Sequence, residues 1–175
     1  MNHPTRILIF TGDGKGKTTA ALGMALRANG HGMPVAIIQF VQGDPAVGEL
    51  TAAAGLQNVE IVQTGLGFLP RPEDPHFSEH RAAAEEGLRK ARQTIAAGRH
   101  SLVILDEVCL AVARGLLDEQ AVIAAVREAR PEACIVLTGR YATPGLIELA
   151  DTVTEMRSIK HGFAVGRQAQ KGVEL

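Results

Sequence analysis

Aromatic residues are scarce in this sequence: five Phe, one Tyr and no Trp make up 3% of 175 residues. Proteins that bind single-stranded nucleic acid stack successive bases on several aromatic side chains, and too few are available here. A basic surplus is also lacking, because 18 Lys and Arg against 19 Asp and Glu leave a net charge of −1. A nonspecific polyanion binder would need that surplus. Both shortages argue against nucleic acid as a partner.

Cysteines and long apolar segments are scarce too. The only two cysteines, Cys109 and Cys134, stand in apolar surroundings without a C-x-x-C spacing, so we interpret them as buried thiols in a reducing compartment. The start of the chain, Met1 to Arg6, lacks the apolar core of a secretory signal. No run of about 18 apolar residues is present that could span a membrane. We therefore expect a cytoplasmic protein without a membrane partner.

Short β-branched runs recur along the chain, and helical patterns separate them. Most of the runs are continuously apolar, which is typical of parallel strands covered by helices on both faces. The alternation of strands and helices predicts a doubly wound α/β fold, and the length suits one domain over residues 1–175. The expected strands are Arg6–Phe10, Val35–Phe40, Val59–Val62, Ser101–Leu105, Cys134–Leu137 and Thr152–Met156.

Helices are expected between these strands, at Thr18–Asn29, Glu79–Ile95, Asp118–Ala129 and Thr143–Ala150. In the second of these, Glu85–Arg89 and Glu86–Lys90 have the i,i+4 spacing of stabilising ion pairs. Asp118 is the expected N-cap of the third helix, and Thr143-Pro144 reads as a cap followed by a first-turn proline.

Two segments do not fit the alternation. Gly65–Pro75 holds two Gly and three Pro, which predicts a long loop of the kind that often carries function. The segment 157–175 holds four Lys and Arg against one acid, and we expect it to wrap along the surface as a C-terminal tail. Its charge is consistent either with a solvated tail or with a segment that lies near a polyanionic ligand.

The strongest functional signal is the segment Phe10–Thr19, which follows the first expected strand and opens the first expected helix. Its glycines let successive backbone N–H groups point into one concavity, and the helix N-terminus adds a positive dipole end. Lys17 supplies a charge for phosphate oxygens, and the Thr18 hydroxyl can ligate Mg²⁺. The pattern departs from the strict P-loop G-x-x-x-x-G-K-[ST] at Thr11, and Asp13 is an unusual acid beside phosphates.

Two further segments support a nucleotide site. The apolar run Leu102–Leu105 ends in Asp106 and Glu107, as in a Walker B strand, where an acid holds Mg²⁺. Arg140 follows the fifth expected strand, so it should lie at the same edge of the sheet as Lys17 and Glu107. It could bind phosphate or pair with a neighbouring acid. The six histidines show no metal-binding spacing; His76 and His80 alone would make a poor zinc site.

Taken in order along the chain, these motifs resemble the ATP:corrinoid adenosyltransferase family. The resemblance covers nearly the whole sequence, and it implies a three-layer, RecA-like P-loop fold with a mainly parallel central sheet. The matching segments are Phe10–Ala20, Arg27–Gly32, Leu105–Glu107, Leu137–Arg140, Leu149–Asp151, Thr154–Met156, Lys160-His161 and Ala169-x-x-Gly172.

The resemblance implies transfer of the 5′-deoxyadenosyl group of ATP to the Co(I) of a reduced corrinoid, with release of triphosphate. Cobalt is the nucleophile, so the protein would contribute positioning and electrostatics. The partners implied are these two substrates and a second copy of the chain in a homodimer. A flavoprotein reductant is a possible further partner. An ordinary small P-loop kinase or NTPase, or a binding module without catalysis, remains as an alternative.

Residue roles follow from the same resemblance. ATP would lie on Gly12, Asp13, Gly14, Lys15, Gly16, Lys17, Thr18 and Thr19, and Lys17, Glu107 and Arg140 would be the catalytic residues. Thr18 and Glu107 would bind Mg²⁺ (or Mn²⁺), with Asp106 behind them, and Arg27 would contact a ligand or shape the site. Many members carry Gly-Phe-Thr-Trp in the loop that handles the corrin ring, whereas this chain has Gly67-Phe68-Leu69-Pro70. Phe68 is then the expected aromatic contact for the corrinoid.

Overall fold

The computed structural model describes residues 4–162 and 166–173, so residues 1–3, 163–165 and 174–175 of the predicted segments lie outside the described part. Its centre is a six-stranded sheet in the order β3-β2-β4-β5-β1-β6. Every neighbouring pair of strands runs parallel. The strands are β1 (Arg6–Thr11), β2 (Val35–Gln39), β3 (Val59–Gln63), β4 (Leu102–Asp106), β5 (Cys134–Thr138) and β6 (Thr152–Glu155).

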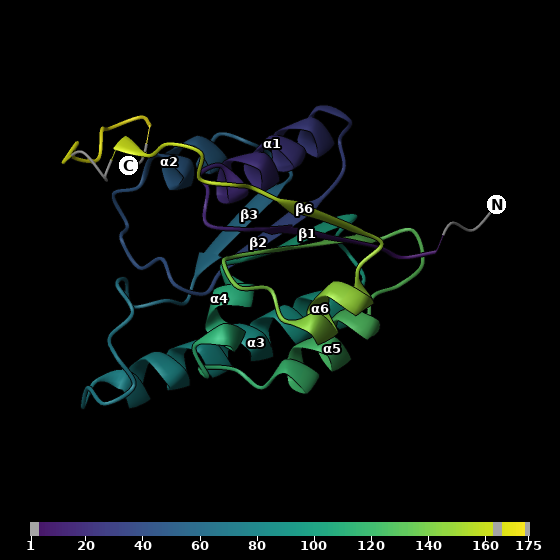
Figure 1. Cartoon of the computed structure of the whole chain (residues 1–175). Coiled ribbons are helices and arrows are strands. Elements are labelled where there is room, and N and C mark those ends of the chain that lie inside the picture. Colours follow the sequence, from purple (N-terminus) through teal and green to yellow (C-terminus); the bar gives the residue numbers. More distant parts are fainter. Residues whose placement is uncertain (1–3, 163–165, 174–175) are drawn as a thin grey trace.

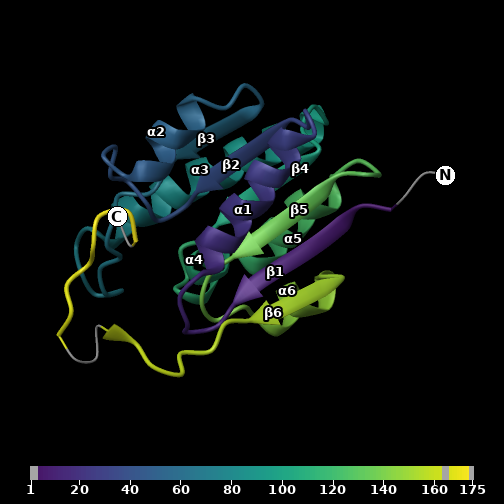
Figure 2. The ribbon, with the colours of Figure 1, turned by 90° about the horizontal axis from the view of Figure 1, so that it is seen from above.

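Six helices are described, and they lie on both faces of the sheet, as Figures 1 and 2 show from two directions. The first two helices lie on one face and the other four on the opposite face. Their bounds are α1 (Lys17–Gly30), α2 (Gly48–Ala54), α3 (Phe77–Ala97), α4 (Val108–Ala113), α5 (Glu119–Arg127) and α6 (Pro144–Leu149). This arrangement confirms the predicted α/β fold with a mainly parallel sheet.

The strands are apolar because both faces of the inner sheet are covered. All five residues of β2 and of β4 are buried. On one face, Ala21, Ala25 and Ala28 of α1 pack in a cluster with Val35, Ile37, Ile104 and Val136 of the strands. These small residues at helical spacing let α1 approach the sheet closely. By contrast, all four residues of the edge strand β6 are exposed.

The opposite face holds the larger core cluster, to which α3, α4, α5 and α6 contribute. Close packing explains why residue 87 of α3 is glycine, since a Cβ on Gly87 would lie 2.5 Å from Thr64 Oγ1 and 3.1 Å from the Phe40 ring. Cys109 lies within this cluster, and burial raises the pKa of its thiol to about 12. Cys134 is half-buried, less enclosed than predicted.

The helices that were predicted form with small shifts of their ends, and three contacts can be compared directly. The Asp118 carboxylate accepts a hydrogen bond from the Ala121 N–H at 2.9 Å, which confirms the N-cap of α5. The expected Glu85–Arg89 pair is wrong, because Arg89 instead pairs with Glu86, three residues before it. The expected Glu86–Lys90 pair is confirmed at 3.8 Å. No helix among the described residues is long and apolar enough to cross a membrane.

The expected loop after the third strand is confirmed, because β3 ends at Gln63 and α3 begins at Phe77. Helices α2 and α4 were not predicted. In Figure 2, β1 and β5 point toward the edge of the sheet from which α1 starts, so the loops that follow them lie at that edge. The C-terminal segment passes the same edge. The amino end of the described chain leaves at the opposite edge.

Candidate nucleotide site

The phosphate loop joins β1 to α1 at the carboxyl edge of the sheet. Gly12 (φ 96°) and Gly16 (φ 111°) take left-handed conformations that favour glycine, and Gly16 stands at the N-cap of α1 without a side-chain cap. No acidic residue occupies the first turn of α1. The first N–H groups of α1 therefore face the loop at the positive end of the helix dipole, as an anion site requires.

Lys17 is buried although it carries a charge. Its Nζ donates hydrogen bonds to the carbonyl oxygens of Gly12 at 2.9 Å and Gly14 at 2.8 Å, so its ammonium group lies within the curl of the loop. Burial lowers the pKa of Lys17, and the charge of Glu107 opposes that shift most strongly. Arg140 adds to the lowering through repulsion between like charges.

A segment after β6 lies directly against the phosphate loop. The Gly14 N–H donates to the Met156 carbonyl oxygen at 2.6 Å. A Cβ on Gly14 would lie 2.6 Å from that oxygen and 2.7 Å from the backbone of Arg157, and a Cβ on Gly12 would also meet Met156. The close approach of residues 156 and 157, rather than a left-handed backbone, therefore explains why Gly14 is glycine.

Asp106, the last residue of β4, is buried at 4% exposure and held by three side chains. Its carboxylate accepts hydrogen bonds from Thr138 Oγ1 at 2.7 Å, Thr18 Oγ1 at 2.9 Å and Gln39 Nε2 at 3.3 Å. Burial raises the pKa of Asp106, and these hydrogen bonds oppose the shift. The Thr18–Asp106 bond links the phosphate loop to the acidic strand across β5, the strand that separates them in the sheet.

Glu107 follows in an unusual conformation for a non-glycine residue, with φ 60° at the N-cap of α4. The left-handed region costs such a residue about 1–2 kcal/mol, and strain of this kind concentrates at functional sites. Its Oε2 is buried and has no hydrogen-bond partner among the described residues. Burial and the neighbouring Asp106 raise the pKa of Glu107, while Lys17 and Arg140 oppose the shift.

The oxygen atoms at this point suit a hard divalent cation. A hydroxyl (Thr18) and two carboxylates (Asp106 and Glu107) are the donor types that Mg²⁺ and Mn²⁺ prefer. The buried Glu107 Oε2 without a partner is the observation that supports the fit. No cluster of three or more His, Cys, Asp or Glu that could hold a metal occurs within the described residues, so protein ligands alone would not complete such a site.

One pocket of about 820 Å³ brings most of the predicted site residues together. Lys15, Gly16, Lys17, Thr18 and Thr19 line it with Asp106, Glu107, Arg140 and Phe68. Arg140 thus lies at the same mouth as Lys17 and Glu107, as its position after the fifth strand predicted. Phe68 projects from the loop after β3 and is 98% exposed. Gly12, Asp13 and Gly14 belong to the loop but not to the lining, and Asp13 is exposed.

Arg27 is not brought to this pocket. It is exposed in the last turn of α1, at the end of the helix remote from the phosphate loop, and it does not line the pocket. The expectation that Arg27 contacts a ligand or shapes the site is therefore not supported for the described chain. The helical rise explains the difference, because a helix of this length carries its two ends about 20 Å apart.

Three residues of the site were not assigned roles from the sequence. Gln39 and Thr138 bond to Asp106 from the ends of β2 and β5. A polar residue at the end of each buried apolar strand is the signal that could have found them. Tyr141, the one tyrosine, lines the pocket with φ 60° and is 53% exposed. Nothing in its sequence position distinguishes Tyr141 beforehand.

The fold and the loop define the class of protein: a P-loop nucleotide-binding protein of the RecA-like type. Among solved structures, a KaiC-like protein from Pyrococcus horikoshii OT3 matches with a TM-score of 0.55 at 16% identity, covering 91% of this chain and 74% of that one. At this identity the likeness concerns the fold alone.

The particular family follows from closer relatives. The family described as ATP:corrinoid adenosyltransferase BtuR/CobO/CobP matches residues 4–175. A corrinoid adenosyltransferase of Pseudomonas aeruginosa is 40% identical over 97% of this chain and 83% of its own length. One from Sinorhizobium sp is 41% identical over 97% and 79%, and one from Escherichia coli K12 is 36% identical over 96% and 84%. The chain belongs to the ATP:corrinoid adenosyltransferase family, which confirms the resemblance inferred from its motifs.

Proposed function

We propose that this protein is a transferase that moves the 5′-deoxyadenosyl group of ATP to the Co(I) centre of a reduced corrinoid and releases triphosphate. The observation that carries the proposal is that one pocket joins the phosphate loop, the acids after β4 and the exposed ring of Phe68. A nucleotide on the loop and an apolar macrocycle against Phe68 would then share one space. The relatives named above carry the same activity in their names.

In this reaction the electron pair of Co(I) forms a bond to C5′ of ATP, and the bond between C5′ and the triphosphate oxygen breaks. The electron pair of the broken bond stays on the triphosphate, and cobalt becomes formally Co(III). No side chain acts as the nucleophile, so the protein's part is to hold both substrates in line and to stabilise the growing negative charge.

Lys17, Arg140 and the N–H groups at the start of α1 are the groups that perform this stabilisation in our proposal. The Lys17 ammonium lies inside the loop. Arg140 lies close enough for its charge to lower the pKa of Lys17 and to oppose the rise in the pKa of Glu107. Mg²⁺ or Mn²⁺ would be held by Thr18 and Glu107, with Asp106 fixing the Thr18 hydroxyl. When bound, the cation supplies positive charge to the triphosphate oxygens.

Phe68 is proposed to contact the corrin ring. An aromatic ring that is 98% exposed on a pocket wall gains most from contact with a flat apolar partner. Pro70 stands where many family members carry Trp, so the contact here would depend on Phe68 from that loop. The partner that we propose for reduction of the corrinoid to Co(I) is a flavoprotein.

We further propose that the chain is one nucleotide-binding domain, that it works as a homodimer, and that it resides in the cytoplasm. The exposed edge strand β6 supports association, because an unpaired strand edge favours pairing with another chain. The free thiols of Cys109 and Cys134 suit a reducing compartment. Sedimentation of the purified protein should give twice the chain mass of 18.5 kDa.

Product analysis tests the activity. Under anaerobic conditions with reduced corrinoid, ATP consumption should yield triphosphate in equal amount to the alkylated corrinoid. An ordinary P-loop kinase or NTPase would release ADP without any need for corrinoid, and that product pattern would overturn the proposal. The alternative is not favoured by the relatives, whose printed name is corrinoid adenosyltransferase.

A further inference from the structure

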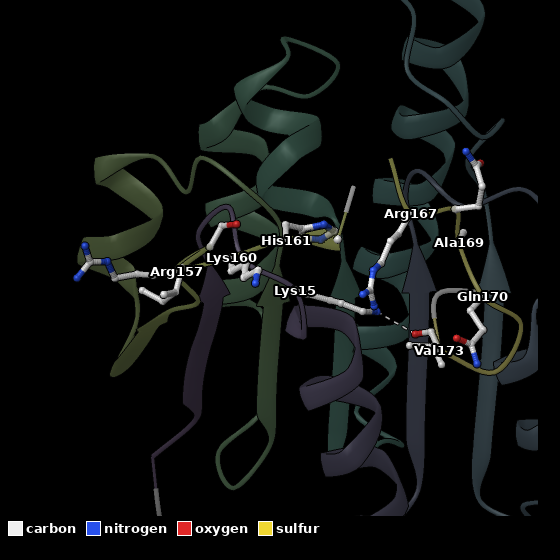
Figure 3. Close-up of a pocket in the computed structure, with 12 residues that line it drawn as sticks. Lys15, Arg157, Lys160, His161, Arg167, Ala169, Gln170 and Val173 are labelled. Atoms are coloured by element: carbon white, nitrogen blue, oxygen red, sulfur yellow. Dashed lines mark hydrogen bonds between the residues drawn. The ribbon is translucent and has the colours of Figure 1, made fainter. Parts of the chain in front are cut away.

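A second hollow, of about 560 Å³, lies between the phosphate loop and the last described residues. Figure 3 shows its wall, with Lys15 of the loop facing the segment after β6. We call it the tail hollow and define it by its lining: Lys15, Arg157, Ser158, Ile159, Lys160, His161, Gly162, Arg167, Gln168, Ala169, Gln170 and Val173. It is a separate space from the nucleotide pocket described above, although Lys15 and Val173 line both.

The lining of the tail hollow is strongly basic. It includes Lys15, Arg157, Lys160 and Arg167, which give four positive charges, together with His161, and the described residues of this lining include no Asp or Glu. Within the described residues, no ion pair is formed by Arg157, Lys160 or Arg167. Like charges gathered on one wall repel each other unless an anion joins them, so the hollow is suited to a ligand that carries several negative charges.

The tail hollow adjoins the nucleotide pocket. Lys15 and Val173 line both spaces, and the Lys15 Nζ donates a hydrogen bond to the Val173 carbonyl oxygen at 2.8 Å. On the other side, the Gly14 N–H donates to the Met156 carbonyl oxygen, immediately before Arg157. The segment that carries the cations is thus attached to the phosphate loop at two points. An anion chain lying on the loop could reach both spaces.

We infer that the tail hollow is an anion subsite that takes part of a polyphosphate chain, so that the loop and the tail together hold the triphosphate. The inference rests on the proposed function for the identity of that leaving group. As the bond between C5′ and oxygen breaks, the triphosphate keeps the electron pair and gains negative charge. Cations such as Lys160 and Arg167 would stabilise it at that moment, and the planar guanidinium group of Arg167 matches phosphate geometry.

Calorimetric titration with inorganic triphosphate, in the absence of corrinoid, tests the subsite. The double variant Lys160→Gln/Arg167→Gln removes two lining charges. The matched control, Arg99→Gln/Arg127→Gln, removes two exposed charges that precede β4 and β5, at the opposite edge of the sheet. Circular dichroism verifies that both variants are folded. We expect the lining variant to bind triphosphate about tenfold more weakly than the control, and to lose less affinity as salt is added.

Equal affinity of the lining variant and the control for triphosphate would overturn the inference, as would no binding of triphosphate by the unaltered protein. Inorganic phosphate is titrated in parallel. It distinguishes a hollow that holds one part of a triphosphate lying on the phosphate loop from a hollow that binds a single phosphate group by itself. If both probes weaken equally, the hollow is a separate phosphate site and the inference fails. Weaker corrinoid binding with unchanged triphosphate affinity would assign the cations to corrin carboxylates instead. The triphosphate titrations contain no corrinoid. Their outcome therefore tests the subsite independently of whether the protein transfers the adenosyl group.

Discussion

In the proposed nucleotide site, Lys17 is the residue expected to contribute most to anion binding. It is charged, buried and held by two carbonyl oxygens of its own loop, and burial lowers its pKa. A charge in so enclosed a position is stabilised most when an anion joins it, since the local dielectric is low. Replacing Lys17 removes the buried ammonium group from the curl of the phosphate loop.

The variant Lys17→Ala should therefore lower the rate of corrinoid alkylation by about 100-fold or more, the typical effect of removing a group that stabilises transition-state charge. Stopped-flow decay of the Co(I) spectrum at saturating ATP measures it. Arg99→Ala serves as the control, since Arg99 is exposed and precedes β4 at the opposite edge of the sheet. An unchanged rate for Lys17→Ala would contradict the assignment of the phosphate loop.

Phe68 raises a different question, because its ring is almost fully exposed and contributes nothing to the core. If it contacts the corrin ring, Phe68→Ala should raise the KM for corrinoid and slow alkylation, while the Kd for ATP stays within about twofold. Phe68→Leu should recover only part of the loss. Equal weakening of ATP and corrinoid would mean that Phe68 has only a structural part in its loop.

At the scale of elements, the contact between the phosphate loop and residues 156 and 157 is specific enough to test. A Cβ at Gly14 would lie 2.6 Å from the Met156 carbonyl oxygen, so Gly14→Ala forces the two segments apart. We expect a weaker Kd for ATP, by about tenfold, with loss of stability of about 1–3 kcal/mol from overpacking. Gly23→Ala on α1 is the control, as a Cβ there meets nothing within 4 Å.

The N-cap of α5 gives a prediction for stability alone. Asp118 accepts the Ala121 N–H, and removing that acceptor leaves one N–H of the helix end without a protein partner. Asp118→Ala should reduce the free energy of unfolding by about 0.5–2 kcal/mol, measured by urea denaturation, whereas Asp118→Asn should lose much less. Since α5 does not line the pocket, a large fall in the ATP affinity of Asp118→Ala would contradict a purely structural role of Asp118 as the N-cap.

Local sequence signals account for most of the elements. Short β-branched runs, most of them continuously apolar, identified all six strands, and helical patterns with cap and proline signals at the helix ends identified α1, α3, α5 and α6. Helix α4 was missed because Val108–Ala113 is a short, continuously apolar run, in which periodicity cannot separate a strand from a buried helix. Helix α2 has seven residues, no side-chain cap and one buried residue, so its local pattern is weak.

The site was predictable where its residues stand in a motif and not where they meet by tertiary contact. The loop, the acid pair and Arg140 follow from strand ends in one parallel sheet. Gln39 and Thr138 bond to Asp106 from the ends of β2 and β5, and Tyr141 lines the pocket just after β5. The segment after β6 meets the loop through Met156, more than a hundred residues away in the chain. Such long-range contacts leave no local signature.

For the whole molecule, the parallel sheet directs the loops after β1, β3, β4 and β5 to one edge, and this brings the phosphate loop, Glu107, Arg140 and Phe68 to a single pocket. The central claim is that the two substrates react there. Its most direct measurement is an anaerobic assay with ATP, Mg²⁺ and chemically reduced cobalamin, following the Co(I) absorbance. We predict that the absorbance disappears only when both the protein and ATP are present, and that triphosphate accumulates in equal amount. Persistence of the Co(I) spectrum, with ATP either untouched or converted to ADP, would contradict the claim.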